Sequence, residues 1–392
     1  MTTNHVSVIG GGPSGLFAVG ALLDAHHDRR QPLQLTWLEA DAELTGAGRL
    51  SRYGFVPANT KTRLFVAALT EFACFREAWE RGGDHDALDR LKREQQDDEC
   101  HLALAAAALV QLTTNLVRLN PGTITPVAGA RVSAIRQLPD GLWSLGIVGK
   151  QQHDQELRPQ HSVVLATGAH PLPVTAQLHT QGHVPVLDLD DALHPDRLAQ
   201  LLLDGSKESA PVAVVGTSHS AVLVMRNLYA LQRRVVNVYR SPQFVYAEYV
   251  TATTIRHDNT GLKGVAAAFA RSHLESPDAA RLTRVPEAEG QHKIGECAAV
   301  VYAIGFERNT LPLIQLHGEH ATGGQPQQRI DYDANGGILV DGTAAKGLFG
   351  FGIAFPKRVV DTGGQPEAAV GLWKFASHIR ASDFASASQN IL

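Results

Sequence analysis

The hydrophobic and polar positions of this 392-residue chain follow two patterns. Short, mainly apolar runs at residues 6–9, 162–165 and 212–215 predict buried parallel strands. Apolar residues at helical spacing over residues 62–118 predict two or three helices, and residues 130–148 predict a β-hairpin around a Pro-Asp-Gly turn. Because strands alternate with helices, we expect an α/β fold with parallel sheets.

A glycine-rich turn follows the first apolar run and leads into a helical pattern. In a G-x-G-x-x-G turn, the first glycine allows the tight bend and the second lets the backbone approach a pyrophosphate. The third lets the helix pack close to the strand, with its N-terminus toward the phosphates. Glu39 ends the next predicted strand, 24 residues after Gly15, where a carboxylate suits a pair of ribose hydroxyls. The alternative interpretation is an ordinary turn with a surface glutamate. The residues of this predicted site are Gly10, Gly12, Pro13, Ser14, Gly15 and Glu39.

A second turn of this kind follows the apolar run at 212–215. Its glycine pattern is degraded, because Ser218 and Ala221 stand at the second and third glycine positions after Gly216. Small residues still allow the close approach, and we add Ser220 to the predicted contacts. Arg240 ends the following strand, where an acid would favour NADH, so the sequence favours NADPH with its 2′-phosphate.

Composition limits the classes of partner. The formal charge is −4, from 35 basic and 39 acidic residues without a basic patch, so no nucleic acid is expected. Cys74, Cys100 and Cys297 form no C-x-x-C pair, which predicts neither disulfides nor a zinc site and suits a reducing cytoplasm. The 18 histidines show no ligand spacing near an acid, so no metal is expected.

We also expect neither a secreted nor a membrane protein. The first strand begins at about the sixth residue, which leaves no room for a signal peptide. The longest apolar stretch, residues 102–112, is expected to be too short to span a bilayer. A length of 392 residues suits two or three domains.

In these motifs the chain resembles the flavoproteins with two dinucleotide-binding domains, which include the flavin-containing and N-hydroxylating monooxygenases and the disulfide oxidoreductases. The resemblance implies FAD at the first turn, NADPH at the second, and two Rossmann-like domains with a β-hairpin and a helical insertion in the FAD domain. It implies an FAD domain at 1–170 and 326–392 and an NADPH domain at 171–325. It rests on the two turns, on Thr167 and Gly168 and on Gly305 at the two crossovers, and on the late turn at Gly352 that closes the FAD site in this family.

Two departures select a branch of the superfamily. No two cysteines lie closer than 26 residues, so the redox pair of the disulfide reductases is missing. The F-x-G-x-x-x-H fingerprint is also absent, whereas the second turn and Gly305-Phe306 are similar to the N-hydroxylating enzymes. The resemblance thus implies an NADPH-dependent FAD monooxygenase that oxygenates a small molecule with O₂, at nitrogen in one version, through a hydroperoxyflavin. The alternatives are a reductase or oxidase without a redox disulfide, and a non-catalytic nucleotide-binding flavoprotein.

The sequence offers only candidates for the substrate side. Asn59 lies in a glycine-rich segment, residues 46–60, that we expect to be a loop. Asn259 lies in a polar loop, for which a structural Asx turn is an equal alternative. Gln365 precedes a predicted helix over residues 368–379, which the resemblance places beside the flavin with Pro366 in its first turn. Apolar residues over 64–75 suit a homodimer, and the sequence does not name the substrate.

Overall fold

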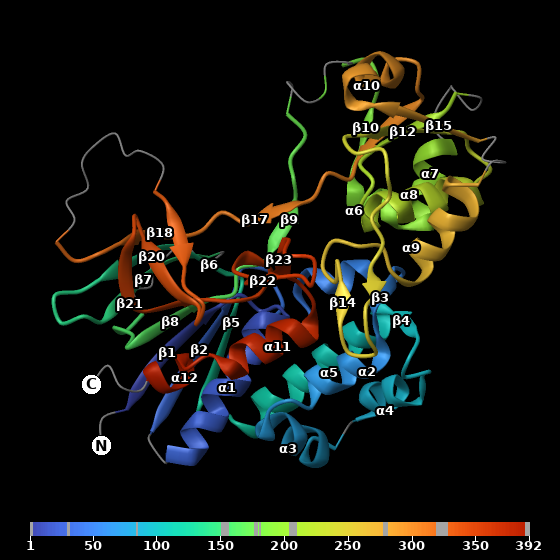
Figure 1. Ribbon diagram of the computed structural model, residues 1–392. Helices are drawn as coiled ribbons and strands as arrows, with labels where there is room; N and C mark the ends of the chain where they lie inside the picture. The colour runs from blue at the N-terminus through green and yellow to red at the C-terminus, as the bar shows by residue number, and fades with distance from the viewer. Residues whose placement is uncertain are drawn as a thin grey trace.

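Two sheets, each with a parallel core of strands, organise the chain, as the apolar runs predicted (Figure 1). The computed structural model describes residues 3–29, 32–83, 85–149, 157–175, 179, 182–203, 210–276, 281–318 and 328–388. The fold is therefore of the predicted α/β class.

The first sheet has seven strands in the order β19-β20-β21-β8-β1-β2-β5. Its strands from β21 to β5 pair in parallel, and helices make the crossover connections from β1 to β2 and from β2 to β5. Strand β20 instead pairs antiparallel with both of its neighbours. The strands are β1 (Asn4–Ile9), β2 (Leu33–Glu39), β5 (Ile124–Ala128), β8 (Ser162–Leu165), β19 (Ile330–Tyr332), β20 (Gly337–Val340) and β21 (Thr343–Gly350).

Alternate residues of this sheet pack into two separate cores. Val164 and Phe349 join the helical core on one face, whereas Val163 and Leu165 join the core beneath a three-stranded sheet on the other. The helices are α1 (Pro13–Arg29), α11 (Leu372–Ala381) and α12 (Phe384–Ala387), and the small sheet holds β6 (Ala130–Gln137), β7 (Trp143–Gly149) and β18 (Leu313–Gln315). The predicted hairpin at 130–148 is confirmed as β6 and β7.

The helical insertion contains four helices within residues 62–83 and 85–119, so the prediction of two or three was wrong. Turns at residues 70–72 and 82–83 divide the apolar pattern, and Gly83 has a φ of +76° there. The helices are α2 (Thr62–Leu69), α3 (Ala73–Arg81), α4 (Asp86–Arg93) and α5 (Leu102–Leu119).

Helix α5 extends beyond the apolar stretch expected from the sequence. Its 18 residues have a mean hydropathy of 1.5, so among the described residues it is the one helix long and apolar enough to cross a membrane. Leu109, Leu112 and Leu116 are buried in the helical core with α2, α3 and α4.

The second sheet has five parallel strands in the order β10-β16-β11-β12-β15. One core lies between this sheet and the helices from α6 to α9, and another lies under α10. The elements are β10 (Val186–Leu187), α6 (Leu189–Leu193), α7 (Pro195–Leu203), β11 (Val212–Val215), α8 (His219–Ala230), β12 (Val235–Tyr239), α9 (Gly264–Phe269) with a π-helical turn at Ala270–Leu274, β15 (Leu282–Pro286), α10 (Glu287–Ile294) and β16 (Ala299–Tyr302).

Two short antiparallel strands, β9 (Ala169–Pro171) and β17 (Phe306–Arg308), carry the chain between the two sheets (Figure 1). Thr167 and Gly168 precede the first of these strands, and Gly305 precedes the second. The hairpin of β13 (Glu248–Tyr249) and β14 (Ile255–Arg256) extends from the second sheet's domain toward the helical insertion of the first.

The structure corrects two local predictions. Residues 46–60 are not one loop, because they contain the 3-10 helix η1 (Gly48–Tyr53) and begin β3 (Pro57–Lys61), which pairs with β4 (Glu99–His101). The helix expected at 368–379 begins at Leu372, after a hairpin of β22 (Lys357–Val360) and β23 (Pro366–Ala369). The Asp361 carboxylate closes the hairpin turn by accepting the N–H of Gly363 at 2.7 Å and of Gln365 at 2.9 Å.

Candidate nucleotide-binding and active site

The first glycine turn is held by contacts that exclude larger side chains. Gly10 has a φ of +118°, and a Cβ there would lie 2.2 Å from the Ala166 carbonyl oxygen. A Cβ on Gly15 would lie 2.0 Å from the Gly10 oxygen, so α1 could not approach β1 as closely. The Trp37 indole Nε1 donates to this Gly10 oxygen at 3.0 Å.

Gly12 is different, because protein atoms do not crowd it. A Cβ there would meet only the Gly48 Cα, at 3.8 Å. Packing against the protein therefore does not explain why the second position is glycine. The close approach of a pyrophosphate to the backbone does explain it. The late turn closes over the same place, since Gly352, with a φ of +82°, would put a Cβ 2.0 Å from the Ser14 Oγ.

Two more predicted residues lie at the first turn. The Glu39 carboxylate accepts the Gly11 N–H at 2.6 Å and the Asp41 N–H at 2.9 Å, so it stands beside the turn at the end of β2. The Thr167 Oγ1 is buried and has no hydrogen-bond partner among the described residues. The open face at Gly12 and this unpartnered hydroxyl suit a dinucleotide.

The second turn repeats the construction of the first. Gly216 has a φ of +120°, and a Cβ there would lie 2.4 Å from the Ala303 oxygen, which precedes the second crossover as Ala166 precedes the first. The Asn237 Nδ2 donates to the Gly216 oxygen at 2.8 Å, as Trp37 donates to Gly10. Sequence reasoning missed both donors, although a polar residue inside the buried β12 run was a usable signal.

The side chains at the second turn are small or uncharged. Ser218 precedes α8 with its Oγ 3.5 Å from the Ala303 oxygen, and Ser220 follows in the first turn of the helix. Burial lowers the pKa of His219 to about 4, and the charge of Lys263 adds to the shift, so this imidazole is neutral at pH 7.

Two cations lie near the second turn, Arg240 directly after β12 and Arg284 on the neighbouring strand β15. Arg240 is exposed, and we find no ion pair for it among the described residues. Arg284, which sequence reasoning missed, donates to the Asn237 Oδ1 at 3.1 Å and lies over the rings of Tyr239 and Phe244. Burial lowers the pKa of Arg284, and its Nη2 is buried without a hydrogen-bond partner in the part of the chain that the structure describes.

The two candidate asparagines lie in different environments. Asn59 is exposed on β3 and accepts the Thr60 hydroxyl at 3.2 Å. Asn259 instead bonds to Glu367 and Lys374 of the C-terminal segment. Gln365 lies in the β22–β23 turn rather than at a helix start, because its N–H is bound to Asp361.

A cleft of about 570 Å³ lies between η1 and α6, and Gly48 at the start of η1 lies beside Gly12 of the first glycine turn. Asp190 spans it by accepting from the Arg49 guanidinium and, at 2.6 Å, from the Tyr53 hydroxyl. Burial raises the pKa of Tyr53 to about 12, and Asp190 adds to the shift. The cleft is lined by Arg49, Arg52, Phe55, Asp188, Asp190, Asp191, His194 and Arg197.

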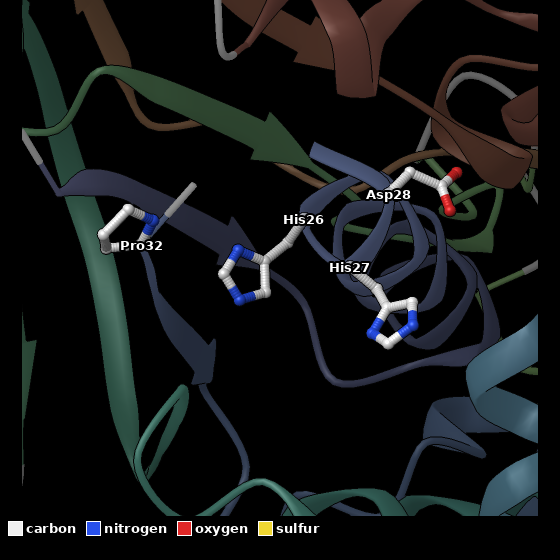
Figure 2. A pocket seen from close by; sticks show the side chains of 4 residues that line it. All are labelled: His26, His27, Asp28 and Pro32. Carbon is white, nitrogen blue, oxygen red and sulfur yellow. The ribbon is translucent and has the colours of Figure 1, made fainter. Parts of the chain in front are cut away.

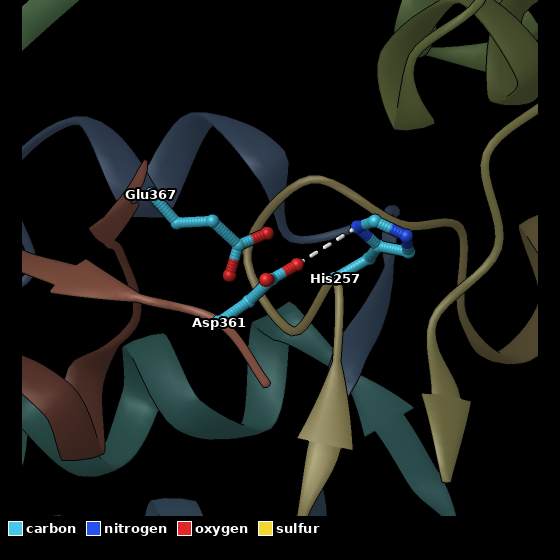
Figure 3. Close-up of side chains that lie close together, drawn as sticks. All are labelled: His257, Asp361 and Glu367. Carbon is cyan, nitrogen blue, oxygen red and sulfur yellow. Dashed lines mark ion pairs between the residues drawn. The ribbon is translucent and has the colours of Figure 1, made fainter. Parts of the chain in front are cut away.

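Two other features lie outside these turns. A hollow of about 620 Å³ lies at the end of α1 opposite the glycine turn and is lined by His26, His27, Asp28 and Pro32 (Figure 2). Figure 3 shows His257, Asp361 and Glu367, which each place a possible ligand atom within 4.8 Å of the others. Both Glu367 oxygens already accept hydrogen bonds from Asn259 and Thr260, so we interpret this group as a link between two segments.

The three cysteines lie apart as free thiols. Cys100 and Cys297 are buried, and Cys74 donates to the Gly20 oxygen at 3.4 Å. Burial raises the pKa of Cys74 and of Cys100, so neither is poised as a thiolate.

Comparison with known proteins gives a relative over nearly the whole chain. The monooxygenase AgnR1 from Paecilomyces divaricatus is 33% identical over 396 residues, which cover 95% of each protein. No protein-family model matches the sequence.

Two solved structures share the fold. The ornithine N-hydroxylase KtzI from Kutzneria sp. 744 has a TM-score of 0.61 at 14% identity, over 99% of each chain. The L-lysine 6-monooxygenase from Pseudomonas syringae has a TM-score of 0.59 at 16% identity, over all of both chains. The fold predicted from the two glycine turns is thereby confirmed, and the 33% identity with AgnR1 shows that this chain belongs to the family of that monooxygenase.

Proposed function

We propose that the protein is an FAD- and NADPH-dependent monooxygenase. The single observation that carries the proposal is the repeated turn, in which Gly10 and Gly216 each have a positive φ, an alanine carbonyl that a Cβ would meet and a side-chain donor on the next strand. One such turn suits one dinucleotide, so two suit a flavin and a nicotinamide. The relative's name and the hydroxylases that share the fold support oxygenation as the outcome.

The first turn is proposed to hold FAD. Gly12 lets the backbone approach the pyrophosphate, the N-terminus of α1 favours its charge, and Glu39 is proposed to bind ribose hydroxyls. Thr167, Gly168 and Gly352 close the site from the crossover and the late turn. We infer that the FAD domain comprises residues 1–170 and 326–392, although the boundary near 325 lies outside the described residues.

The second turn is proposed to hold NADPH, in a domain of residues 171–325. Gly216, Ser218, Ser220 and Gly305 would surround the pyrophosphate, while Arg240 binds the 2′-phosphate. Bound flavin would supply the redox chemistry, by accepting a hydride from NADPH and then reacting with O₂. The chain's part is to orient the two nucleotides and to keep water away.

The cleft between η1 and α6 is our proposed place for the organic substrate. Its volume suits a small molecule, and its lining comes both from η1 of the first domain and from α6 of the second. Oxygenation at nitrogen is the version that the two hydroxylases favour. We further propose a cytoplasmic enzyme without nucleic-acid or membrane partners, which can form a homodimer through its helical insertion.

The experiment is anaerobic reduction of the purified yellow protein. We expect non-covalent FAD, released by denaturation, and bleaching of its absorbance by one equivalent of NADPH faster than by NADH. A colourless protein that gains no flavin from added FAD would overturn the proposal. Bleaching by NADPH without oxygenation of any substrate would favour a reductase or oxidase.

A further inference from the structure

A cluster of polar side chains joins the loop after β14 to the segment that leads into α11. From the loop come Asp258, Asn259, Thr260 and Lys263, and from the C-terminal segment come Glu367 and Lys374 (Figure 3 shows Glu367 beside the loop). We call these six residues the interdomain polar cluster. The loop belongs to the domain of the second sheet, whereas α11 packs against α1 under the first.

Glu367 is the centre of the cluster. It is only 8% exposed, and its Oε1 accepts from the Thr260 hydroxyl at 2.7 Å and the Thr260 N–H at 3.2 Å. Its Oε2 accepts from the Asn259 Nδ2 at 2.9 Å and the Asn259 N–H at 3.2 Å. A buried carboxylate whose two oxygens are both bound by one loop fixes that loop in position.

Asn259 reaches further, to the start of α11. Its Oδ1 accepts from the Val370 N–H at 3.2 Å and from the Lys374 Nζ at 2.6 Å. Lys374 lies in the first turn of α11 and also pairs with Asp258 at 2.5 Å. The loop is thus bound to both sides of the junction between β23 and α11, by charged and neutral donors together.

This junction lies in the frame that carries the first glycine turn. Helix α1 begins at that turn, and α11 packs along α1, so a loop fixed to α11 is fixed relative to the turn. The loop also leads through Lys263 into α9, and α9 packs against α8, the helix that begins at the second turn. The cluster therefore bridges the two glycine turns.

We propose that Asn259, Glu367 and Lys374 are positioning residues, which hold the NADPH domain at the orientation in which NADPH can reduce the flavin. The inference rests on the proposed function. In that step NADPH loses a hydride and becomes NADP⁺, and FAD gains the hydride and one proton from water. Reacting atoms must lie about 3–3.5 Å apart, and a misplacement of about 1 Å costs roughly a hundredfold in rate.

The test is anaerobic stopped-flow reduction of the FAD-loaded protein by two reductants. Glu367→Gln replaces one acceptor oxygen by a donor that faces the N–H groups of the loop, and we expect NADPH to reduce this variant at least tenfold more slowly. Dithionite is small and does not use the NADPH domain, so its rate and the FAD content should not change. Arg380→Gln is the matched control, because Arg380 lies at the other end of α11 and pairs with Glu71 at 3.1 Å.

A second pair of variants separates positioning from folding. Lys374→Gln should slow reduction by NADPH as Glu367→Gln does, while Lys374→Arg keeps a cation that reaches Asn259 and Asp258 and should retain most of the rate. If Glu367→Gln does not fold, the comparison of Lys374→Gln with Lys374→Arg tests the positioning role by itself. The inference would be overturned if NADPH reduced Glu367→Gln or Lys374→Gln as fast as it reduces the unmodified protein. It would also be overturned if NADPH and dithionite lost the same factor in rate. Failure of NADPH to reduce the unmodified protein would instead overturn the proposed function.

Discussion

Gly12→Ala and Gly15→Ala form a matched pair, since both add one methyl group to the same turn. On Gly15 the methyl carbon would lie 2.0 Å from the Gly10 oxygen and 3.1 Å from the Trp37 Nε1, so the helix must move away from the strand. Overpacking of this kind costs about 1–3 kcal/mol, and a rigid backbone neighbour puts it near 3 kcal/mol. On Gly12 the nearest protein atom is 3.8 Å away, so stability without flavin should change by about 0.5 kcal/mol or less.

Gly12→Ala, which should leave the flavin-free protein stable, should weaken the binding of FAD. A methyl group at the closest approach of the pyrophosphate removes at least one charge-assisted hydrogen bond, worth about 1.5–3 kcal/mol. The FAD dissociation constant should therefore rise roughly ten- to hundredfold in Gly12→Ala.

The assay has two parts. Urea unfolding of the flavin-free proteins measures the cost to the fold, because bound ligand would otherwise add to stability. Quenching of FAD fluorescence measures binding. If Gly12→Ala binds FAD as the unmodified protein does, or loses as much stability as Gly15→Ala, the reasoning about this turn is wrong.

Three further substitutions test other parts of the structure. Arg240→Ala should raise the Michaelis constant for NADPH roughly ten- to hundredfold and leave that for NADH unchanged, because a contact to the 2′-phosphate contributes about 1.5–3 kcal/mol. Tyr53→Phe removes the 2.6 Å hydrogen bond to Asp190 and should cost about 1–2 kcal/mol in urea unfolding, whereas Tyr249→Phe, at a 61% exposed site, should cost nothing measurable. His219 has a pKa of about 4 in the fold against an ordinary 6.5, so it stays neutral while the unfolded chain takes up a proton. This difference should lower the free energy of unfolding by at most about 3 kcal/mol between pH 6.5 and 4. The loss should be smaller in His219→Gln.

Each of these has an outcome that contradicts it. Equal changes for the two nicotinamides would remove Arg240 from the 2′-phosphate site. Equal stabilities of Tyr53→Phe and Tyr249→Phe would mean that the bond to Asp190 contributes nothing. Parallel stability curves from pH 6.5 to 4 for His219→Gln and the unmodified protein would mean that His219 is not held neutral.

The frame of the fold could be predicted from the sequence because its signals are local. The apolar run before Gly10 and the spacing from Gly10 to Gly15 lie within a dozen residues, and the same holds for the run before Gly216. Local patterns also misled, since the residues before α11 form a hairpin closed by the Asp361 side chain, where apolar spacing predicted an earlier helix.

The links between distant segments could not be predicted in this way. Glu367 binds Asn259 across 108 residues, and no periodic pattern relates the two positions. Trp37 and Asn237 donate to glycine carbonyls that follow the neighbouring strands, and these contacts can be predicted only when the register of the sheet is known. Arg284 joins the second site only because β15 pairs with β12. Each depends on pairing that a single sequence does not reveal.

The central claim, that this chain is a monooxygenase, is tested most directly with ¹⁸O₂. The FAD-loaded protein would be given NADPH, ¹⁸O₂ and a panel of small substrates that includes primary amines, with products examined by mass spectrometry and peroxide measured in parallel. We predict that a true substrate gains one ¹⁸O atom per NADPH oxidised while peroxide release falls. Release of one peroxide per NADPH with every substrate, and no ¹⁸O in any product, would contradict the account.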